Sequence, residues 1–234
     1  MHIGILQCDH VVDQLMPTFG DYPDMFRRLL LSTDPSLQFT IYDLTRNEFP
    51  VSANDHDAWL ITGSKWSTYD SDPWIRRAEE FIRELHAYKS RTVGICFGHQ
   101  LIAQSLGGKV EQASHVGWGV GVHETEIKVQ RPWMDPPAST LSLLVSHQDQ
   151  VTVLPEGAQI LASHDFCSID MYELEGYMLG FQGHPEFSKE YSRSTMVRRR
   201  HLIGEETFES GVLSLENPIN ESIAAQWILR FMSA

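Results

Sequence analysis

Residues 92–98 read TVGICFG, and this stretch decides how the rest of the chain is interpreted. Residues 92–96 have the composition of a short buried strand and run directly into a glycine-containing turn. A short helix is predicted at residues 99–106, and the glycine pair 107–108 ends it. A strand that turns sharply into a helix is typical of sheets built from β-α-β units. The stretch therefore predicts a mainly parallel sheet covered by helices.

The first ninety residues alternate strands and helices in the same way. The predicted elements are strands at residues 3–8, 39–44 and 58–62, and a helix at residues 23–31. A second helix begins after Asp72, which we expect to be its N-cap, with Pro73 in the first helical position. The apolar face of that helix consists of Trp74, Ala78, Phe81, Ile82 and Leu85.

Strands dominate the middle of the chain. The runs expected to be strands are residues 121–129, 141–146, 159–163, 168–173 and 177–182. Strands that follow one another with little helix between them indicate either hairpins added to the sheet or a small antiparallel layer. Helical patterns return at residues 188–203 and 221–232. We expect one domain over residues 1–234, with a core at about 1–190 and a helical C-terminal extension at about 190–234.

Composition excludes several classes of partner. Lys and Arg number 18 against 31 Asp and Glu, a net charge of −13, which disfavours binding to nucleic acid and to anionic membranes. No uncharged apolar run approaches the ~18 residues of a spanning helix, and the start lacks a signal-peptide pattern. The cysteines, Cys8, Cys96 and Cys167, are odd in number and far apart. We therefore expect a reduced, cytoplasmic protein.

Cys96 lies at the centre of a Gly-x-Cys-x-Gly turn formed with Gly94 and Gly98. This is a nucleophile elbow with a thiol in place of the serine hydroxyl, and side chains at the glycine positions would crowd it. The sulfur would lie at a helix N-terminus, which favours a thiolate, with the Phe97 N–H directed toward an oxyanion beside it. The alternative interpretation is a buried structural cysteine.

A base for this thiol is predicted at His184, followed by Pro185 and Glu186. Residues two apart on an extended segment point to the same side, and Pro185 favours an extended His184. We expect Glu186 to orient the imidazole while the ring faces Cys96. No role is predicted for His2, His10, His56, His86, His123, His164 or His201.

Other kinds of site fit the sequence less well. CxxC, HxH and HExxH spacings are absent, as is a nucleotide-binding Gly-x-x-x-x-Gly-Lys loop, so we expect no metal and no cofactor. An ordinary serine hydrolase is disfavoured because Gly-x-Ser-x-Gly is absent. The arginines at 198–200 are interpreted as facing solvent near a helix C-terminus.

Two segments resemble the signatures of class I glutamine amidotransferase domains: residues 94–100, GICFGHQ, and residues 182–186, QGHPE. Residues 62–64 lie where that family carries its oxyanion-loop glycines. Residues 146–151, SHQDQV, resemble its Ser-His-Gly-Asp-x-Val segment, and residues 117–119 its glutamine-cradling turn. The motifs occur in the family order over residues 1 to about 190.

The resemblance implies a flavodoxin-like three-layer α/β/α sandwich with a catalytic triad of Cys96, His184 and Glu186. It also implies an oxyanion hole formed by Phe97 together with Gly63 or Ser64. The residues it implies for holding the α-amino and α-carboxylate groups of glutamine are Gln100, Gly117, Trp118, His147 and Gln148.

The chain departs from the family pattern at two places. Residues 62–65 read TGSK in place of Ser-Gly-Gly-Pro, so either Gly63 or Ser64 can donate the second oxyanion N–H. Gln148 replaces the glycine of Ser-His-Gly-Asp. Both variants, and residues 72–75 (DPWI), resemble a stand-alone, GMP-synthase-like subgroup that includes γ-glutamyl peptidases.

Three functions follow from the resemblance. The first is amidotransferase-type hydrolysis of glutamine through a Cys thioester, with the ammonia passed to a separate synthetase chain because the tail is too short for one. The second is hydrolysis of γ-glutamyl compounds such as glutathione conjugates by the chain alone. The third is a non-catalytic binding or regulatory role, which the complete triad disfavours.

Overall fold

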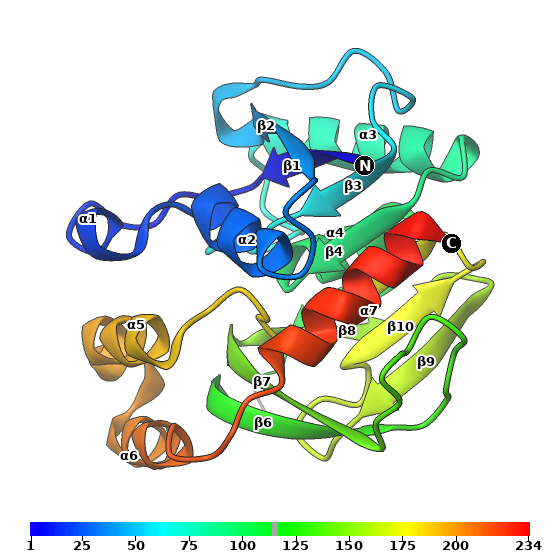
Figure 1. Cartoon of the computed structure of the whole chain (residues 1–234). Helices are drawn as coiled ribbons and strands as arrows, with labels where there is room; N and C mark the ends of the chain where they lie inside the picture. Colours follow the sequence, from blue (N-terminus) through cyan, green and yellow to red (C-terminus); the bar gives the residue numbers. More distant parts are fainter. Residues whose placement is uncertain (114–116) are drawn as a thin grey trace.

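The computed structural model describes residues 1–113 and 117–234. Within these residues, nine strands form one sheet in the order β2-β1-β3-β4-β11-β10-β9-β6-β7 (Figure 1). The strands of its first half are β2 (Gln38–Asp43), β1 (His2–Gln7), β3 (Ala58–Ile61), β4 (Thr92–Ile95) and β11 (Met178–Phe181). These five strands are parallel to one another. β3, β4 and β11 are buried at every position, as expected for strands covered on both faces.

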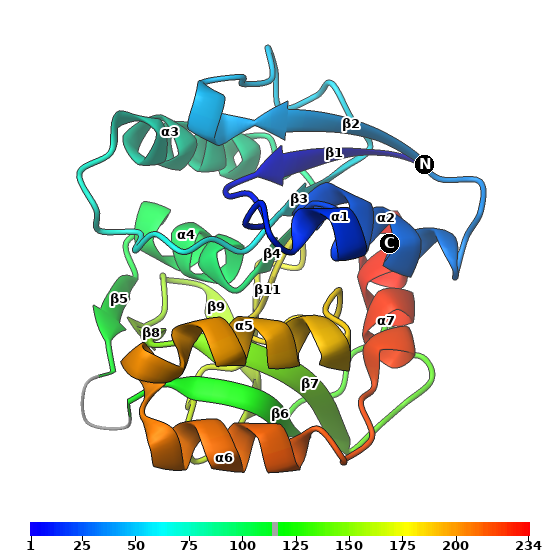
Figure 2. The same ribbon diagram turned by 90° about the vertical axis from the view of Figure 1, so that its left-hand side faces the viewer.

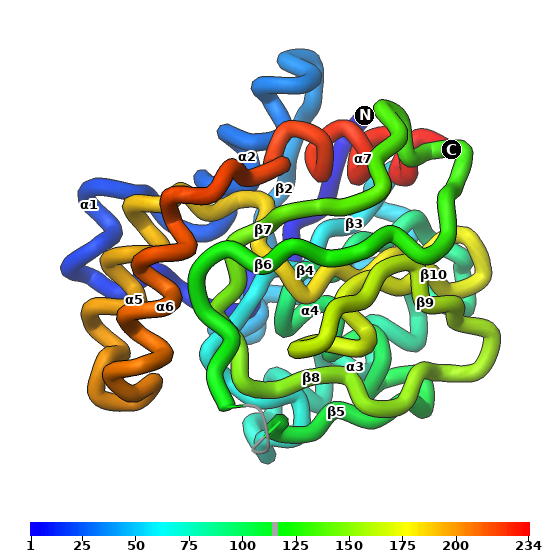
Figure 3. Tube along the Cα trace, turned by 90° about the horizontal axis from the view of Figure 1, so that it is seen from below, coloured from blue at the N-terminus to red at the C-terminus, as the bar shows by residue number. Residues whose placement is uncertain are grey.

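The second half of the sheet is antiparallel. It consists of β10 (Met171–Leu174), β9 (Ala158–Ser163), β6 (Gly119–Ile127) and β7 (Thr140–His147). The expectation of antiparallel strands added to a parallel sheet is therefore confirmed. A separate antiparallel pair, β5 (Lys109–Gln112) with β8 (Asp149–Val153), lies at one edge of the molecule, and neither of its strands was among those predicted (Figure 3).

Helices cover both faces of the parallel half, which gives three layers. On one face, α2 (Tyr22–Leu31) and α7 (Glu221–Ser233) bury Phe26, Trp227 and Phe231 against β1, β3 and β4. On the other face, α3 (Pro73–Ala87) and α4 (Phe97–Ser105) bury apolar side chains against the same strands. This arrangement, with strand order 2-1-3-4-11, is the flavodoxin-like sandwich that was expected.

The C-terminal helices pack against the sheet and the core of the molecule. α7 is part of the main core, since Trp227 and Ile228 are fully buried. α5 (Lys189–Ile203) and α6 (Glu205–Ser214) pack against each other and against β6 (Figure 2). No helix in the part of the chain that the structure describes is long and apolar enough to cross a membrane.

Some local predictions differ from the structure. Asp72 occupies the N-cap position of α3, but its side chain accepts no capping hydrogen bond. α4 begins at Phe97, two residues earlier than predicted, because the turn is completed at Cys96 itself. The single-turn helices α1 (Met16–Phe19) and η1 (Leu44–Arg46) and the helix α6 were not predicted.

Candidate active site

The turn at Cys96 has the strained geometry that the sequence predicts. Cys96 has φ 51° and ψ −100°, a backbone conformation that non-glycine residues rarely adopt, and its N–H donates to the Phe181 carbonyl at 2.7 Å. A Cβ on Gly94 would lie 2.4 Å from the Gly98 carbonyl carbon. A Cβ on Gly98 would lie 2.5 Å from the Ile61 carbonyl oxygen. Both glycines are therefore needed for β4 and α4 to meet at the thiol.

We expect Gly98→Ala to lower the free energy of unfolding by about 1–3 kcal/mol, the usual cost of inserting a group into filled space. The group it would contact is the backbone of β3, which cannot rotate away. Urea denaturation of the wild type and the variant measures the difference. A change below about 0.5 kcal/mol would contradict this account of the turn.

His184 and Glu186 form a buried pair next to this turn. The His184 Nδ1–H donates to Glu186 Oε1 at 2.7 Å, and the two side chains are 4% and 0% exposed. Burial by itself lowers the pKa of His184, but the charge of Glu186 and the nearby Cys96 outweigh it and raise the pKa well above its ordinary value. The imidazole is therefore biased toward its protonated form at neutral pH.

The elements that hold these groups meet at one edge of the sheet. Cys96 follows β4, His184 follows β11, and Gly63 follows β3, all at the carboxyl ends of parallel strands. A Cβ on Gly63 would lie 2.8 Å from His184 Cε1 and 3.6 Å from Cys96 Cβ. The thiol, the imidazole and the backbone at Gly63 thus converge at the place where a reacting carbonyl group could bind.

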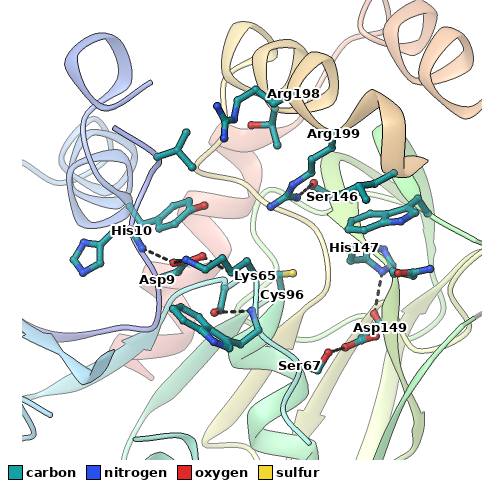
Figure 4. Close-up of a pocket in the computed structure, with 18 of the residues that line it drawn as sticks. Asp9, His10, Lys65, Ser67, Cys96, Ser146, His147, Asp149, Arg198 and Arg199 are labelled. Carbon is teal, nitrogen blue, oxygen red and sulfur yellow. Dashed lines mark hydrogen bonds and ion pairs between the residues drawn. The ribbon is translucent and has the colours of Figure 1, made fainter. Parts of the chain in front are cut away.

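Cys96 borders a cavity of about 490 Å³ that is open to solvent. Figure 4 shows side chains from the loop after β1, from β7 and from α5 around this cavity. Of the residues predicted for the site, the following border it: Ser64, Cys96, Gln100, Trp118, His147 and Gln148.

Gln100 and His147 are fixed by hydrogen bonds to one backbone carbonyl. Gln100 Nε2 donates to the Asp149 carbonyl at 2.8 Å and to Gln182 Oε1 at 3.1 Å, and the His147 Nδ1–H donates to the same Asp149 carbonyl at 3.1 Å. Burial lowers the pKa of His147 to about 3, so this ring is neutral. The remaining predicted residues, Gly63, Phe97, Gly117, His184 and Glu186, do not line the cavity wall.

One wall of the cavity was not predicted from the sequence. Asp9 and His10, which follow β1, line it together with Lys65. Their position directly after a buried strand was a usable signal, because the carboxyl ends of parallel strands lie at the same edge. No role was predicted for His10, yet it bridges Asp21 and Asp43 at 2.7 and 2.9 Å.

The interpretation of the arginines at 198–200 as facing solvent holds for Arg198 and Arg200, which are exposed, and was wrong for Arg199. Arg199 Nη1 donates to Ser146 Oγ at 2.9 Å, and its guanidinium lies 5.7 Å from the Trp118 ring centroid. Arg198 also borders the cavity (Figure 4). Arg200 pairs with Glu205 at the surface. Helical periodicity identified the helix, but the element that this helix faces is set by the tertiary fold.

The described residues contain no cluster of three or more His, Cys, Asp or Glu side chains that could hold a metal ion. The titratable groups near Cys96 instead form hydrogen-bonded pairs, such as His184 with Glu186 and Asp9 with Lys65. The chemistry that this arrangement offers is nucleophilic attack by a thiol, with proton transfer through an imidazole.

A flavodoxin-like sandwich with a Cys elbow and a His–Glu pair at the carboxyl edge of its parallel strands has the features of a class I amidotransferase. The model of the glutamine amidotransferase class-I family matches residues 27–203. The chain therefore belongs to the class I glutamine amidotransferase family, whose members are hydrolytic enzymes.

Individual relatives agree with this assignment. The chain is 30% identical over 246 residues to a glutamine amidotransferase-like protein of Schizosaccharomyces pombe, with 99% of this chain and 98% of that protein covered. It is 32% identical over 185 residues to gamma-glutamyl peptidase 3 of Arabidopsis thaliana, covering 74% and 72%. The solved structure of a glutamine amido transferase from Methylobacillus flagellatus matches with a TM-score of 0.76 at 18% identity, covering 99% of this chain and 94% of that chain, which is a likeness of fold.

Proposed function

We propose that the chain hydrolyses the γ-amide bond of γ-glutamyl compounds through a thioester on Cys96. The Cys96 thiolate attacks the γ-carbonyl carbon, and backbone N–H groups of Phe97 and of Gly63 or Ser64 bind the oxyanion. As the C–N bond breaks, the His184 imidazolium gives its proton to the leaving nitrogen. Water, deprotonated by His184, then attacks the thioester, which releases glutamate and restores the thiolate.

The observation that carries this proposal is the buried hydrogen bond of 2.7 Å between His184 and Glu186 beside the strained Cys96 turn. A structural cysteine requires neither a positive φ nor an imidazole whose pKa is raised by a carboxylate. The arrangement is costly to fold, and a nucleophile with its acid–base partner accounts for it.

The cavity favours a substrate larger than glutamine. Its volume of about 490 Å³ lies in the range that holds an extended small molecule. Among the described residues, neither Arg198 nor Arg199 is paired with a carboxylate, although the protein has a net charge of −13. Two unpaired guanidinium groups complement the two carboxylates of a γ-glutamyl peptide. The similarity to a gamma-glutamyl peptidase supports the same substrate class.

A hydrolysis screen tests this proposal. The purified chain is assayed with glutamine, glutathione and γ-glutamyl conjugates, and released glutamate is measured. We expect turnover of the γ-glutamyl peptides by the chain alone. Turnover of glutamine only, and only after a synthetase chain is added, would favour the amidotransferase function instead. Absence of turnover on all substrates would contradict hydrolysis.

For Arg199→Gln, we expect KM for glutathione to rise about 10–100-fold with kcat within about threefold, because one charge-assisted contact to a carboxylate is lost. Arg200→Gln is the matched control, since its guanidinium pairs with Glu205 at the surface. Steady-state kinetics of the two variants give the comparison. Equal KM values in both would contradict a role for Arg199 in binding the substrate.

A further inference from the structure

We propose that Asp9 is a positioning residue that holds residues 62–65, the loop with the proposed oxyanion donors Gly63 and Ser64, over Cys96. The inference rests on the proposed function. It concerns how this chain fixes a loop whose sequence departs from the family pattern. Asp9 lines the cavity, and the role proposed for it is to hold this loop through Lys65.

The Asp9 carboxylate holds one residue of this loop at two points. Asp9 is 3% exposed. Its Oδ2 accepts the backbone N–H of Lys65 at 3.0 Å, and its Oδ1 accepts Lys65 Nζ at 2.9 Å (Figure 4). Oδ1 also accepts the His10 N–H at 2.8 Å, which fixes the carboxylate relative to its own backbone. The loop end at Lys65 is therefore tied to the segment that follows β1.

The other end of the loop is tied to the same segment. The Thr62 N–H donates to the Leu6 carbonyl at 3.1 Å, and Thr62 Oγ1 accepts the Cys8 N–H at 2.9 Å. The loop is thus held at Thr62 and at Lys65, the two residues that flank the proposed donors. Both attachments go to the chain around residues 6–9.

The two proposed backbone donors, at Gly63 and Ser64, lie between these two attachments. Within residues 1–113 and 117–234, the N–H groups of Gly63 and Ser64 donate to no protein acceptor. Gly63 lies against His184 and Cys96, and Ser64 lines the cavity with Cys96. Two unbonded N–H groups held at both sides and placed beside a nucleophile are what a preorganised oxyanion site requires.

The substitution of the family's proline explains why Asp9 is needed. In Ser-Gly-Gly-Pro, the proline restricts the backbone directly through its ring. Lys65 stands at that position, and its backbone is free of this restriction. The N–H that a proline would lack is the group that Asp9 Oδ2 accepts. A hydrogen bond to a buried carboxylate thus replaces the covalent restraint.

The lysine side chain has a second effect. An unpaired carboxylate near the oxyanion would oppose the negative charge that develops there. Lys65 Nζ, on a side chain that is 56% exposed, neutralises Asp9 while remaining partly hydrated. The pair therefore positions the loop without adding net negative charge.

The test compares Asp9→Asn with Asp13→Asn, a control at an exposed position on the same segment. For Asp9→Asn we expect kcat for glutathione to fall about 100-fold with KM within about threefold, the scale of losing an oxyanion donor. The γ-aldehyde of glutamate is an inhibitor whose carbonyl carbon is attacked by the Cys96 thiolate to give a tetrahedral hemithioacetal. Its inhibition constant should rise by a similar factor in Asp9→Asn. Alkylation of Cys96 by iodoacetamide forms no oxyanion and should keep its rate.

Each outcome decides a separate point. A kcat within threefold of wild type, or an unchanged inhibition constant, would overturn the role of Asp9. A fall in the rate of alkylation by iodoacetamide that matches the fall in kcat would also overturn this role, because it would show that the substitution alters the reactivity of the Cys96 thiol. If the wild-type chain releases no glutamate, the proposed function is wrong. The role of Asp9 is then decided by comparing the affinity of wild type and Asp9→Asn for the aldehyde. If Asp9→Asn does not fold, Lys65→Met is used in its place. For Lys65→Met we expect the inhibition constant of the aldehyde to rise about tenfold. An unchanged inhibition constant would contradict the role of Asp9.

Discussion

Cys96→Ala is expected to lower kcat for γ-glutamyl hydrolysis by about 10⁶-fold, the usual scale for removing a catalytic nucleophile. Cys96 is the one cysteine that combines a strained turn, a helix N-terminus and a bordering cavity. Cys8 and Cys167 are fully buried, and burial raises the pKa of both thiols, which keeps them unreactive. Release of glutamate by equal amounts of wild type and variant measures the effect.

Cys167→Ala is the matched control for this experiment. It removes a buried thiol of the same size outside the proposed machinery, so kcat should stay within about threefold of wild type. Thermal unfolding of both variants shows whether the fold is retained. Residual hydrolysis by folded Cys96→Ala at more than a few per cent of the wild-type rate would exclude Cys96 as the nucleophile.

The second large effect is expected for Glu186→Gln. The amide retains the size of the carboxylate, but it loses the negative charge that His184 faces at 2.7 Å. We expect kcat to fall by about 10²–10⁴-fold, as when the orienting acid of a triad is neutralised. Glu190→Gln, at an exposed position in the first turn of α5, is the control and should behave like wild type.

The same variant should change the pH dependence in a defined direction. In the wild type, Glu186 and Cys96 raise the pKa of His184, so the imidazolium needed to protonate the leaving group persists to high pH. It is lost as the pH rises through that raised pKa. Without the carboxylate, the loss occurs at lower pH, and the alkaline limb of kcat/KM should move down by about 1–3 pH units. An unchanged alkaline limb would contradict the coupling of His184 to Glu186.

Four strands of the parallel half, β2, β1, β3 and β4, could be predicted from the sequence because each alternates with a helical pattern. β11 was expected among the antiparallel strands of the middle of the chain, and no sequence pattern indicated its parallel pairing with β4. The TVGICFG stretch also predicted the turn at Cys96, since Gly94 and Gly98 have a steric reason to be glycine. The pair β5–β8 was missed because its strands are short, with β5 mostly exposed, and so give little apolar pattern.

The candidate site could be predicted only in part. Motifs identified Cys96, His184 and Glu186, because their chemistry is tied to local spacing. Arg199 carries no such local pattern and reaches the cavity through the packing of α5. The one local signal for Asp9 is its position just after β1, which does not specify its contact with Lys65. The same limit applies to α7, which was predicted as a helix at residues 221–232 but whose contact with α2 and the sheet depends on the whole fold.

The proposed thioester on Cys96 can be detected directly. The wild-type chain is mixed with a γ-glutamyl peptide, quenched in acid during turnover, digested and analysed by mass spectrometry. We expect the peptide containing Cys96 to gain the mass of one γ-glutamyl group, and hydroxylamine to remove it. Hydrolysis that proceeds with no adduct on Cys96 in the acid-quenched enzyme, or with the adduct on another residue, would contradict a thioester mechanism at this site.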